Sequence, residues 1–417
     1  MAEGNDMAIR ILRSIHGIFK RDSEPEEFVI IPTDDNTKNK SPVLYEQRNL
    51  GLESWCVKLV YNYASLVLLD SREALRRGKL PFSKMEDLNH LLIGALLINP
   101  DVTTFWNMKR DLVEKDILAV EEELYFSKVV LTRKSKSNEA FGYRRWLLKR
   151  ILDKMAANNL HIPLALLQNE LFVTNLASEK SPNNYHSWNH RIWCLENIVP
   201  KNQSISNIVY SELSYSQEWI NNHVSEHAGY HYRQYLIKLV RDHKKIVTLY
   251  NSYYNFVVKT LLNTTNDGDC SNLLTYLFGK ANKTKFLEEI CSYVNYVCIL
   301  LYDLCVVVDK LNKLYPEHEA LFCHRKFLIY SLLKVPHEYH GLDSSPRREL
   351  DLESFRGSPA DVEENRWPKL FKRSPRCELY NVYSLVSTCE KNFASQNCSV
   401  MQLDKYRKWL THVVGFE

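Results

Sequence analysis

The stretch NYHSWNHRIWCL, residues 184–195, decides the fold, because its pattern returns elsewhere in the chain. Three further segments align with it without gaps: NEAFGYRRWLL, EHAGYHYRQYLI and HEALFCHRKFLI, which begin at Asn138, Glu226 and His318. In each copy an aromatic residue is followed three positions later by an arginine and then by an apolar run. The pairs are Phe141 with Arg144, Trp188 with Arg191, Tyr230 with Arg233, and Phe322 with Arg325. A weaker copy, DVTTFWNMKRDLV, places Lys109 and Arg110 after Trp106.

The spacing of these copies predicts a repeat architecture. Successive aromatic positions from Trp106 to Phe322 are 35, 47, 42 and 92 residues apart. A period of this size is typical of a pair of antiparallel helices, and such pairs stack so that each buries the apolar face of the next. Apolar residues also recur at helical spacing elsewhere, and alternating strand patterns are nearly absent. We therefore expect an all-α fold, an α–α superhelix or solenoid of helical hairpins.

The repeated pair of aromatic residue and arginine has a structural explanation. Residues three apart share one face of a helix, so we expect the ring to enter the core between repeats. The arginine stem would pack beside the ring, and its guanidinium would reach backbone carbonyls or a carboxylate of the neighbouring repeat. We interpret these positions as architecture.

Composition narrows the possible functions. The 417 residues include 12 glycines, and no glycine-rich phosphate loop is present, which argues against a nucleotide-binding α/β enzyme. A net charge of +4 gives no indication of nucleic-acid binding. The ten cysteines are scattered, and neither a signal peptide nor a C-terminal lipidation cysteine is recognisable. The apolar run Tyr293–Val308 is too short to span a bilayer, so we expect a reduced, soluble, cytoplasmic protein.

The chain is expected to divide into four segments. Residues 1–42 would form an N-terminal helix and a flexible segment, and residues 43–335 the helical repeats, with an Asn/Thr/Gly/Lys-rich insertion near 263–284. Residues 336–376, rich in proline and charge, are predicted to form a disordered loop. Helices in residues 377–417 would close the solenoid.

The segment NYHSWNHR closely resembles the signature repeat of protein prenyltransferase α subunits, which reads approximately N-Y-x-x-W-x-x-R. The resemblance covers roughly residues 90–335 and includes several copies in register. It implies a crescent of helical hairpins that wraps a separate β subunit. In this family the β subunit holds the zinc, the lipid pocket and most diphosphate contacts, and zinc activates the substrate thiol. The resemblance therefore implies no metal or cofactor on this chain, with zinc in the β subunit and an isoprenoid diphosphate as substrate.

Three residues match family positions at the edge of that active site. Lys136 matches a lysine that contacts the diphosphate, where a cation stabilises charge on the leaving group. A solvated loop cation is the competing interpretation, and Lys134 in the same run RKSKS could equally be meant. Tyr185 and His186 match a Tyr-His pair that faces the β subunit near the diphosphate, although a structural hydrogen bond would also explain the histidine.

Departures from the family pattern concern the substrate. Asn138 stands where the family has tyrosine, and Phe141 replaces the tryptophan. Glu139 replaces a glutamine that clamps the terminal carboxylate of CaaX substrates, and a glutamate there would repel that carboxylate. The dipeptide Lys136-Ser137 is shared with Rab-type α subunits. These positions favour a Rab-type β partner and a geranylgeranyl donor. The alternative is a non-catalytic helical scaffold for protein–protein interaction; RNA binding is disfavoured because the arginines have core-facing spacing.

Overall fold

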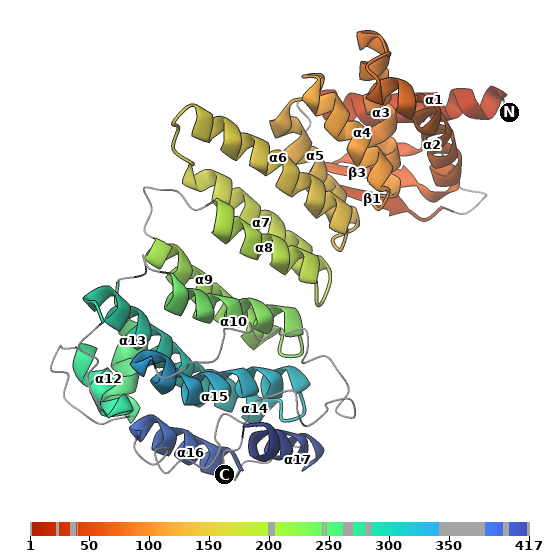
Figure 1. Ribbon diagram of the computed structural model, residues 1–417. Coiled ribbons are helices and arrows are strands. Elements are labelled where there is room, and N and C mark those ends of the chain that lie inside the picture. The colour runs from red at the N-terminus through yellow and green to blue at the C-terminus, as the bar shows by residue number, and fades with distance from the viewer. Residues whose placement is uncertain are drawn as a thin grey trace. The chain divides into compact units, whose positions relative to one another are not determined.

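The computed structural model describes residues 2–21, 25–33, 39, 41–198, 205–243, 246, 248–261, 270–279, 285–341, 380–394 and 400–414. The chain forms two compact units, Met1–Asn202 and Gln203–Glu417. Helices dominate each of them (Figure 1), so the prediction of an all-α fold built from helical hairpins is confirmed.

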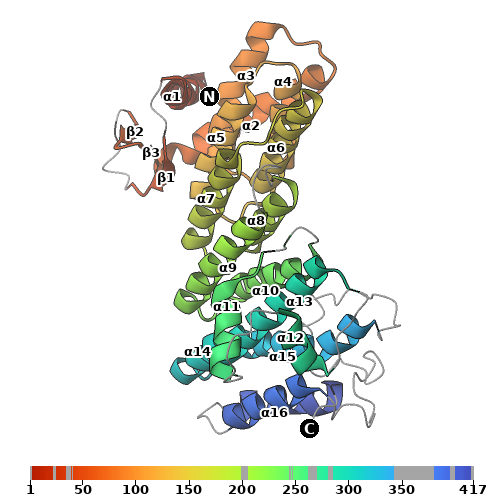
Figure 2. The same cartoon turned by 90° about the vertical axis from the view of Figure 1, so that its left-hand side faces the viewer.

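The first unit begins with a helix and a small sheet and continues as paired helices. Its elements are α1 (Ala2–Lys20), β1 (Glu27–Ile31), β2 (Val43–Glu46), β3 (Asn49–Glu53), α2 (Ser54–Arg76), α3 (Phe82–Ile98), α4 (Thr103–Glu114), α5 (Val120–Arg133), α6 (Asn138–Ala157), α7 (Leu164–Lys180) and α8 (Tyr185–Asn197). Helices α3, α5 and α7 pack in one layer, and α4, α6 and α8 pack in the other, as Figure 2 shows for the last two pairs.

The three-stranded sheet was not predicted. Its order is β1-β3-β2, with β1 parallel and β2 antiparallel to β3. The turn between β2 and β3 is made by Gln47 and Arg48, whose φ angles are 48° and 66°. Such turns normally carry Asn-Gly or Asp-Gly, so the sequence gives no hairpin signal here. Residues 27–31, which lie in the segment expected to be flexible, form β1 instead.

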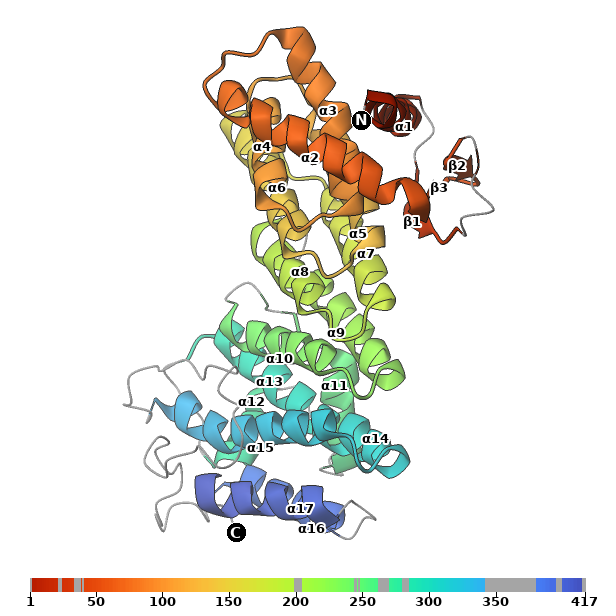
Figure 3. The ribbon, with the colours of Figure 1, turned by 90° about the vertical axis from the view of Figure 1, so that its right-hand side faces the viewer.

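The second unit also consists mainly of helical pairs. Its elements are α9 (Ile205–Asn222), α10 (His227–Asp242), α11 (Asn251–Phe256), the π-helical η1 (Val257–Leu261), α12 (Cys270–Phe278), α13 (Leu287–Tyr302), the π-helical η2 (Asp303–Val308), α14 (Asp309–Leu314), α15 (Glu319–His340), α16 (Asn381–Ala394), α17 (Val400–Lys408) and the π-helical η5 (Trp409–Val414). Helix α10 packs on α13 and α15, and α15 packs on α16 and α17, in the order visible in Figure 3.

The predicted segments differ from this organisation in two further places. The insertion expected near residues 263–284 contains α12, which packs on α13 and α16. Helix α15 includes Pro336 and continues to His340, so the start of the predicted disordered loop is helical. Residues 342–376 lie outside the described residues.

The most apolar helix lies in the core of the second unit. The helical stretch Leu287–Leu314 has 28 residues and a mean hydropathy of 1.8 in its most apolar window, enough to cross a membrane by length and composition. The prediction that this run is too short is therefore wrong, because the helix extends beyond it on both sides. However, 67% of the window is buried, and the stretch packs against α10, α11, α12 and α15, as a core helix does.

Candidate functional site

The repeated segments all occupy the second helix of a hairpin. They lie at the start of α6, α8, α10 and α15, and the weaker copy lies at the start of α4. The aromatic side chains are buried, as predicted; the set is Trp106, Phe141, Trp188, Tyr230 and Phe322, each at most 3% exposed. The rings therefore hold the hairpins together.

The arginines reach the predicted kinds of partner. The Arg144 guanidinium donates to the Leu124 carbonyl at 2.5 Å on the preceding helix and to both Glu170 oxygens at 2.7 and 2.8 Å on the next hairpin. Arg233 repeats this arrangement with the Leu213 carbonyl and Asp303. The other two repeat arginines also have such partners: Arg191 donates to the Leu171 carbonyl and to Thr174, and Arg325 donates to Asp309 and Glu390.

The carboxylates that receive these cations form a series that the sequence analysis missed. We call the four buried acids Glu123, Glu170, Glu212 and Asp303 the acid ladder. Each accepts a hydrogen bond from the residue directly before the repeat arginine of its own hairpin; the pairs are Glu123 with Tyr143, Glu170 with His190, Glu212 with Tyr232, and Asp303 with His324. Glu123, Glu170 and Asp303 also bind a cation of the preceding hairpin, which is Lys109, Arg144 and Arg233, respectively. A carboxylate 20 or 21 residues before each tyrosine or histidine is the signal that could have revealed them.

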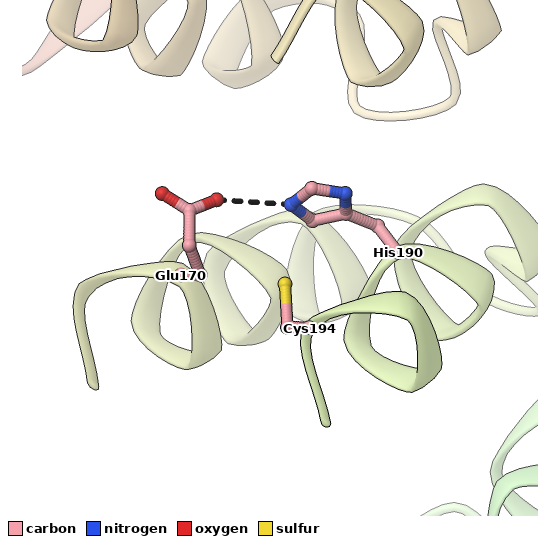
Figure 4. A group of neighbouring side chains, drawn as sticks. All are labelled: Glu170, His190 and Cys194. Carbon is pink, nitrogen blue, oxygen red and sulfur yellow. Dashed lines mark hydrogen bonds and ion pairs between the residues drawn. The ribbon is translucent and has the colours of Figure 1, made fainter. Parts of the chain in front are cut away.

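Glu170, with its partners Arg144 and His190, illustrates the electrostatics of the acid ladder. The Glu170 and Arg144 side chains are 1% and 4% exposed, and His190 Nε2 lies 2.9 Å from Glu170 Oε2 (Figure 4). Burial opposes ionisation of Glu170, but the Arg144 charge and the hydrogen bonds from His190 and Arg144 outweigh it and lower the pKa of Glu170 to about 2. Burial also lowers the pKa of His190, which is therefore neutral near pH 7.

Glu170 and His190 also belong, with Cys194, to the one group of three side chains in the described part of the chain that could hold a metal ion. Ligand atoms of Glu170, His190 and Cys194 lie within 4.8 Å of one another, and Figure 4 shows the thiol pointing toward the other two. Both Glu170 oxygens already hold the Arg144 guanidinium, whose positive charge disfavours a metal ion. Burial raises the pKa of the Cys194 thiol, so that it stays protonated. The chemistry of these three side chains therefore fits a structural ion-pair and hydrogen-bond group better than a metal centre.

A tethered turn presents Lys136. In the turn 134–137, which connects α5 to α6, Lys134 pairs with Asp101, and Ser135 bonds to Ser181 Oγ at 2.7 Å. Ser137 caps α6 by accepting from the Ala140 amide at 3.3 Å. Lys136 is exposed and, among the described residues, has no hydrogen-bond or ion-pair partner. Of the two lysines that the sequence left open, Lys136 is thus the one whose ammonium group is available.

The turn lies beside the start of α8, which carries the other two predicted site residues. The Asn184 side chain donates to the Ser135 carbonyl at 2.7 Å and accepts from the Ser187 amide at 3.2 Å, so it joins the turn to the N-terminus of α8. Tyr185 and His186 follow on the first turn of that helix, each partly buried. The structure therefore brings the three sequence-predicted residues to one edge of the first unit.

Positive charge accumulates at this edge. Burial is the main cause of a lowered pKa of His186, and the charges of Arg145 and Lys136 lower it further, while Asp101 opposes them. The N-termini of α6 and α8 add partial positive charge. Arg145, which the sequence analysis did not single out, is half-buried, and no hydrogen-bond or ion-pair partner for it is found among the described residues. We call Lys136, Arg145 and His186 the cationic edge.

The departures noted in the sequence lie next to the cationic edge. Asn138 and Glu139 are the first two residues of α6. Asn138 is exposed and Glu139 is partly exposed. Both side chains are therefore in a position to influence what approaches Lys136.

Comparison with known proteins identifies two of the helical hairpins as repeats of a known family. The family model for the protein prenyltransferase alpha subunit repeat matches residues 120–151 and 167–198, which correspond to the hairpins α5–α6 and α7–α8. The human protein prenyltransferase alpha subunit repeat-containing protein 1 is 28% identical over 420 residues, covering 96% of each chain. The Danio rerio protein of the same name is 30% identical over 337 residues, which is 77% of this chain and 71% of the relative. The Rattus norvegicus geranylgeranyl transferase type-2 subunit alpha is 26% identical over 187 residues, 43% of this chain and 29% of the relative.

Proposed function

Because this chain belongs to the family of protein prenyltransferase alpha subunit repeat proteins, we propose that it is the α subunit of a heterodimeric protein prenyltransferase and is active only with a β subunit. The reaction would transfer an isoprenoid from its diphosphate to a cysteine in the C-terminal region of a protein substrate. The geranylgeranyl group is the favoured donor, a Rab-type geranylgeranyltransferase β subunit is the first candidate partner, and the cytoplasm is the expected location.

The cationic edge is the observation that carries this proposal. An isoprenoid diphosphate gains negative charge on its leaving oxygens as the bond to C1 breaks, and preorganised cations stabilise that charge. Lys136 is free to contact the diphosphate while its neighbours in the turn are tied to other residues. His186 is neutral near pH 7, so its ring can donate one hydrogen bond and remain a weak base.

The β subunit would supply the remaining parts of the site. Zinc in that subunit would lower the pKa of the substrate thiol. The role of this chain would be to hold the diphosphate from the opposite side and to orient the partner. Glu139, next to Lys136, would disfavour a free terminal carboxylate at that place, which supports a Rab-type partner over a CaaX-type one.

The test is co-expression of the chain with a Rab-type geranylgeranyltransferase β subunit, followed by an assay of radiolabelled geranylgeranyl transfer to a protein with C-terminal cysteines. We expect a stoichiometric complex that is active. Lys136→Ala should retain the complex and lower kcat by about a hundredfold, the lower end of what one lost donor to a developing anion costs.

Lys134→Ala is the matched control, because it removes a lysine of the same turn that already pairs with Asp101. Equal losses for the two variants would argue against a specific role of Lys136. A chain that binds no prenyltransferase β subunit would contradict the proposal and would favour the helical scaffold, which the loss of tyrosine at Asn138 also favours.

A further inference from the structure

Arg145 differs from the other arginines of the repeat segments. The repeat arginines Arg144, Arg191, Arg233 and Arg325 are buried and bind carbonyls, hydroxyls or carboxylates. Arg145 is half-buried on α6 and has neither a hydrogen-bond nor an ion-pair partner in the described ranges. A guanidinium that loses water without gaining an acceptor destabilises the folded chain, so its position requires another explanation.

The direction of the side chain supplies a geometric clue. Nη2 of Arg145 lies 3.9 Å from the position that a Cβ atom would take at Gly142, one turn earlier in α6. The guanidinium therefore lies back along the helix, toward the N-terminal end where Lys136 and the start of α8 are found. Side chains in helices lean in this direction, and here nothing larger than a glycine stands in the way.

Arg145 and Lys136 both act electrostatically on the neutral His186 ring, so the groups of the cationic edge lie near one another. Asp101 is the carboxylate that acts on His186, and it is engaged by Lys134. Two cations beside a neutral histidine, with the nearby carboxylate already engaged, are typical of a site for an anion. A guanidinium is also well suited to phosphate, because its planar donors can form two parallel hydrogen bonds.

We propose that Arg145 is a second diphosphate-binding cation of the cationic edge, acting together with Lys136 on the turn and the neutral His186 on α8. This inference rests on the proposed function for its ligand, an isoprenoid diphosphate. Lys136 and Arg145 are both contributed by this chain, so the α subunit would bind the diphosphate by two charged groups and not by one.

The experiment compares Arg145→Gln and Arg145→Lys with Arg150→Gln in the complex with the β subunit. Arg150 is an exposed arginine of the same helix that lies over the Trp146 ring at 5.2 Å, so its replacement controls for loss of one positive charge from α6. For Arg145→Gln we expect the KM for geranylgeranyl diphosphate and the inhibition constant for inorganic diphosphate to rise about tenfold each, as for loss of a charged hydrogen bond. Arg145→Lys should recover part of this loss, and Arg150→Gln should behave as wild type.

A second measurement separates a binding role from a structural one. Thermal unfolding of the chain without its partner should show that Arg145→Gln melts no lower than wild type, because an unpaired guanidinium is removed. Inorganic diphosphate should raise the melting temperature of wild type and of Arg150→Gln but not of Arg145→Gln.

The outcomes distinguish the two proposals. Transfer activity with unchanged kinetics in Arg145→Gln would refute the role of Arg145 and leave the proposed function standing. A complex without transfer activity, in a chain that still binds inorganic diphosphate through Arg145, would refute the proposed function and keep the anion site. Failure of wild type both to transfer and to bind diphosphate would overturn both, and a lower melting temperature of Arg145→Gln would assign the residue to the fold.

Discussion

Replacement of Glu170 by glutamine tests whether the acid ladder holds the hairpins together. The substitution keeps the shape of the side chain but leaves the buried Arg144 guanidinium without its counter-charge. Removal of one partner of a buried ion pair typically costs 3–5 kcal/mol in the free energy of unfolding. The pKa of Glu170, lowered from 4.5 to about 2, gives a similar value of about 3 kcal/mol at about 1.4 kcal/mol per pKa unit. For a unit of this size the melting temperature should fall by roughly 6–12 °C.

The assay is urea unfolding of the purified chain, followed by circular dichroism at pH 7 and at lower pH. Glu73→Gln is the matched control, because Glu73 is 48% exposed and pairs with Arg76 at the surface, where ion pairs contribute about 0–1 kcal/mol. The folded-state pKa of Glu170 lies below its unfolded value. Its contribution is therefore complete above about pH 4.5 and is lost as the pH falls toward 2. The difference between wild type and Glu170→Gln should accordingly narrow below pH 4.5.

A double variant completes the test. Glu170→Leu with Arg144→Met removes both charges and should recover much of the lost stability, since buried ion pairs can often be replaced by apolar residues without loss. Equal effects of Glu170→Gln and Glu73→Gln, or a difference between wild type and Glu170→Gln that does not change between pH 7 and pH 3, would refute the proposed energetic role of the ladder.

Two further predictions concern protons and metal. Burial, and then the charges of Lys20, His90 and Lys109, lower the pKa of His16 from 6.5 to about 4. The contribution of His16 to the free energy of unfolding should therefore be complete above pH 6.5 and decline as the pH falls toward 4. Hydrogen exchange in α1 should show this decline in wild type but not in His16→Gln. Because both Glu170 oxygens bind Arg144, EDTA should leave the melting temperature of the isolated chain unchanged. A lower melting temperature in EDTA would instead support a metal ion bound by Glu170, His190 and Cys194.

The repeats could be predicted from sequence because each copy keeps its aromatic residue and arginine at a fixed separation. The acid ladder was harder to recognise, because its members lie on a different helix about 20 residues away and are three glutamates and one aspartate. Their partners alternate between tyrosine and histidine. The sheet was missed for a different reason: the turn at Gln47 and Arg48 is built from residues that rarely adopt positive φ angles.

Arg144 and Arg145 show most clearly where sequence reasoning ends. The two residues are neighbours with identical side chains, but successive residues of a helix point about 100° apart, so they face different surroundings. Arg144 lies three residues after Phe141, and that spacing alone directs it to the interface with the next hairpin, where Glu170 receives it. The surroundings of Arg145 depend on where α8 begins, because His186 lies on the first turn of that helix. The first role follows from periodicity, whereas the second requires the packing of two helices whose starts are 47 residues apart in the sequence.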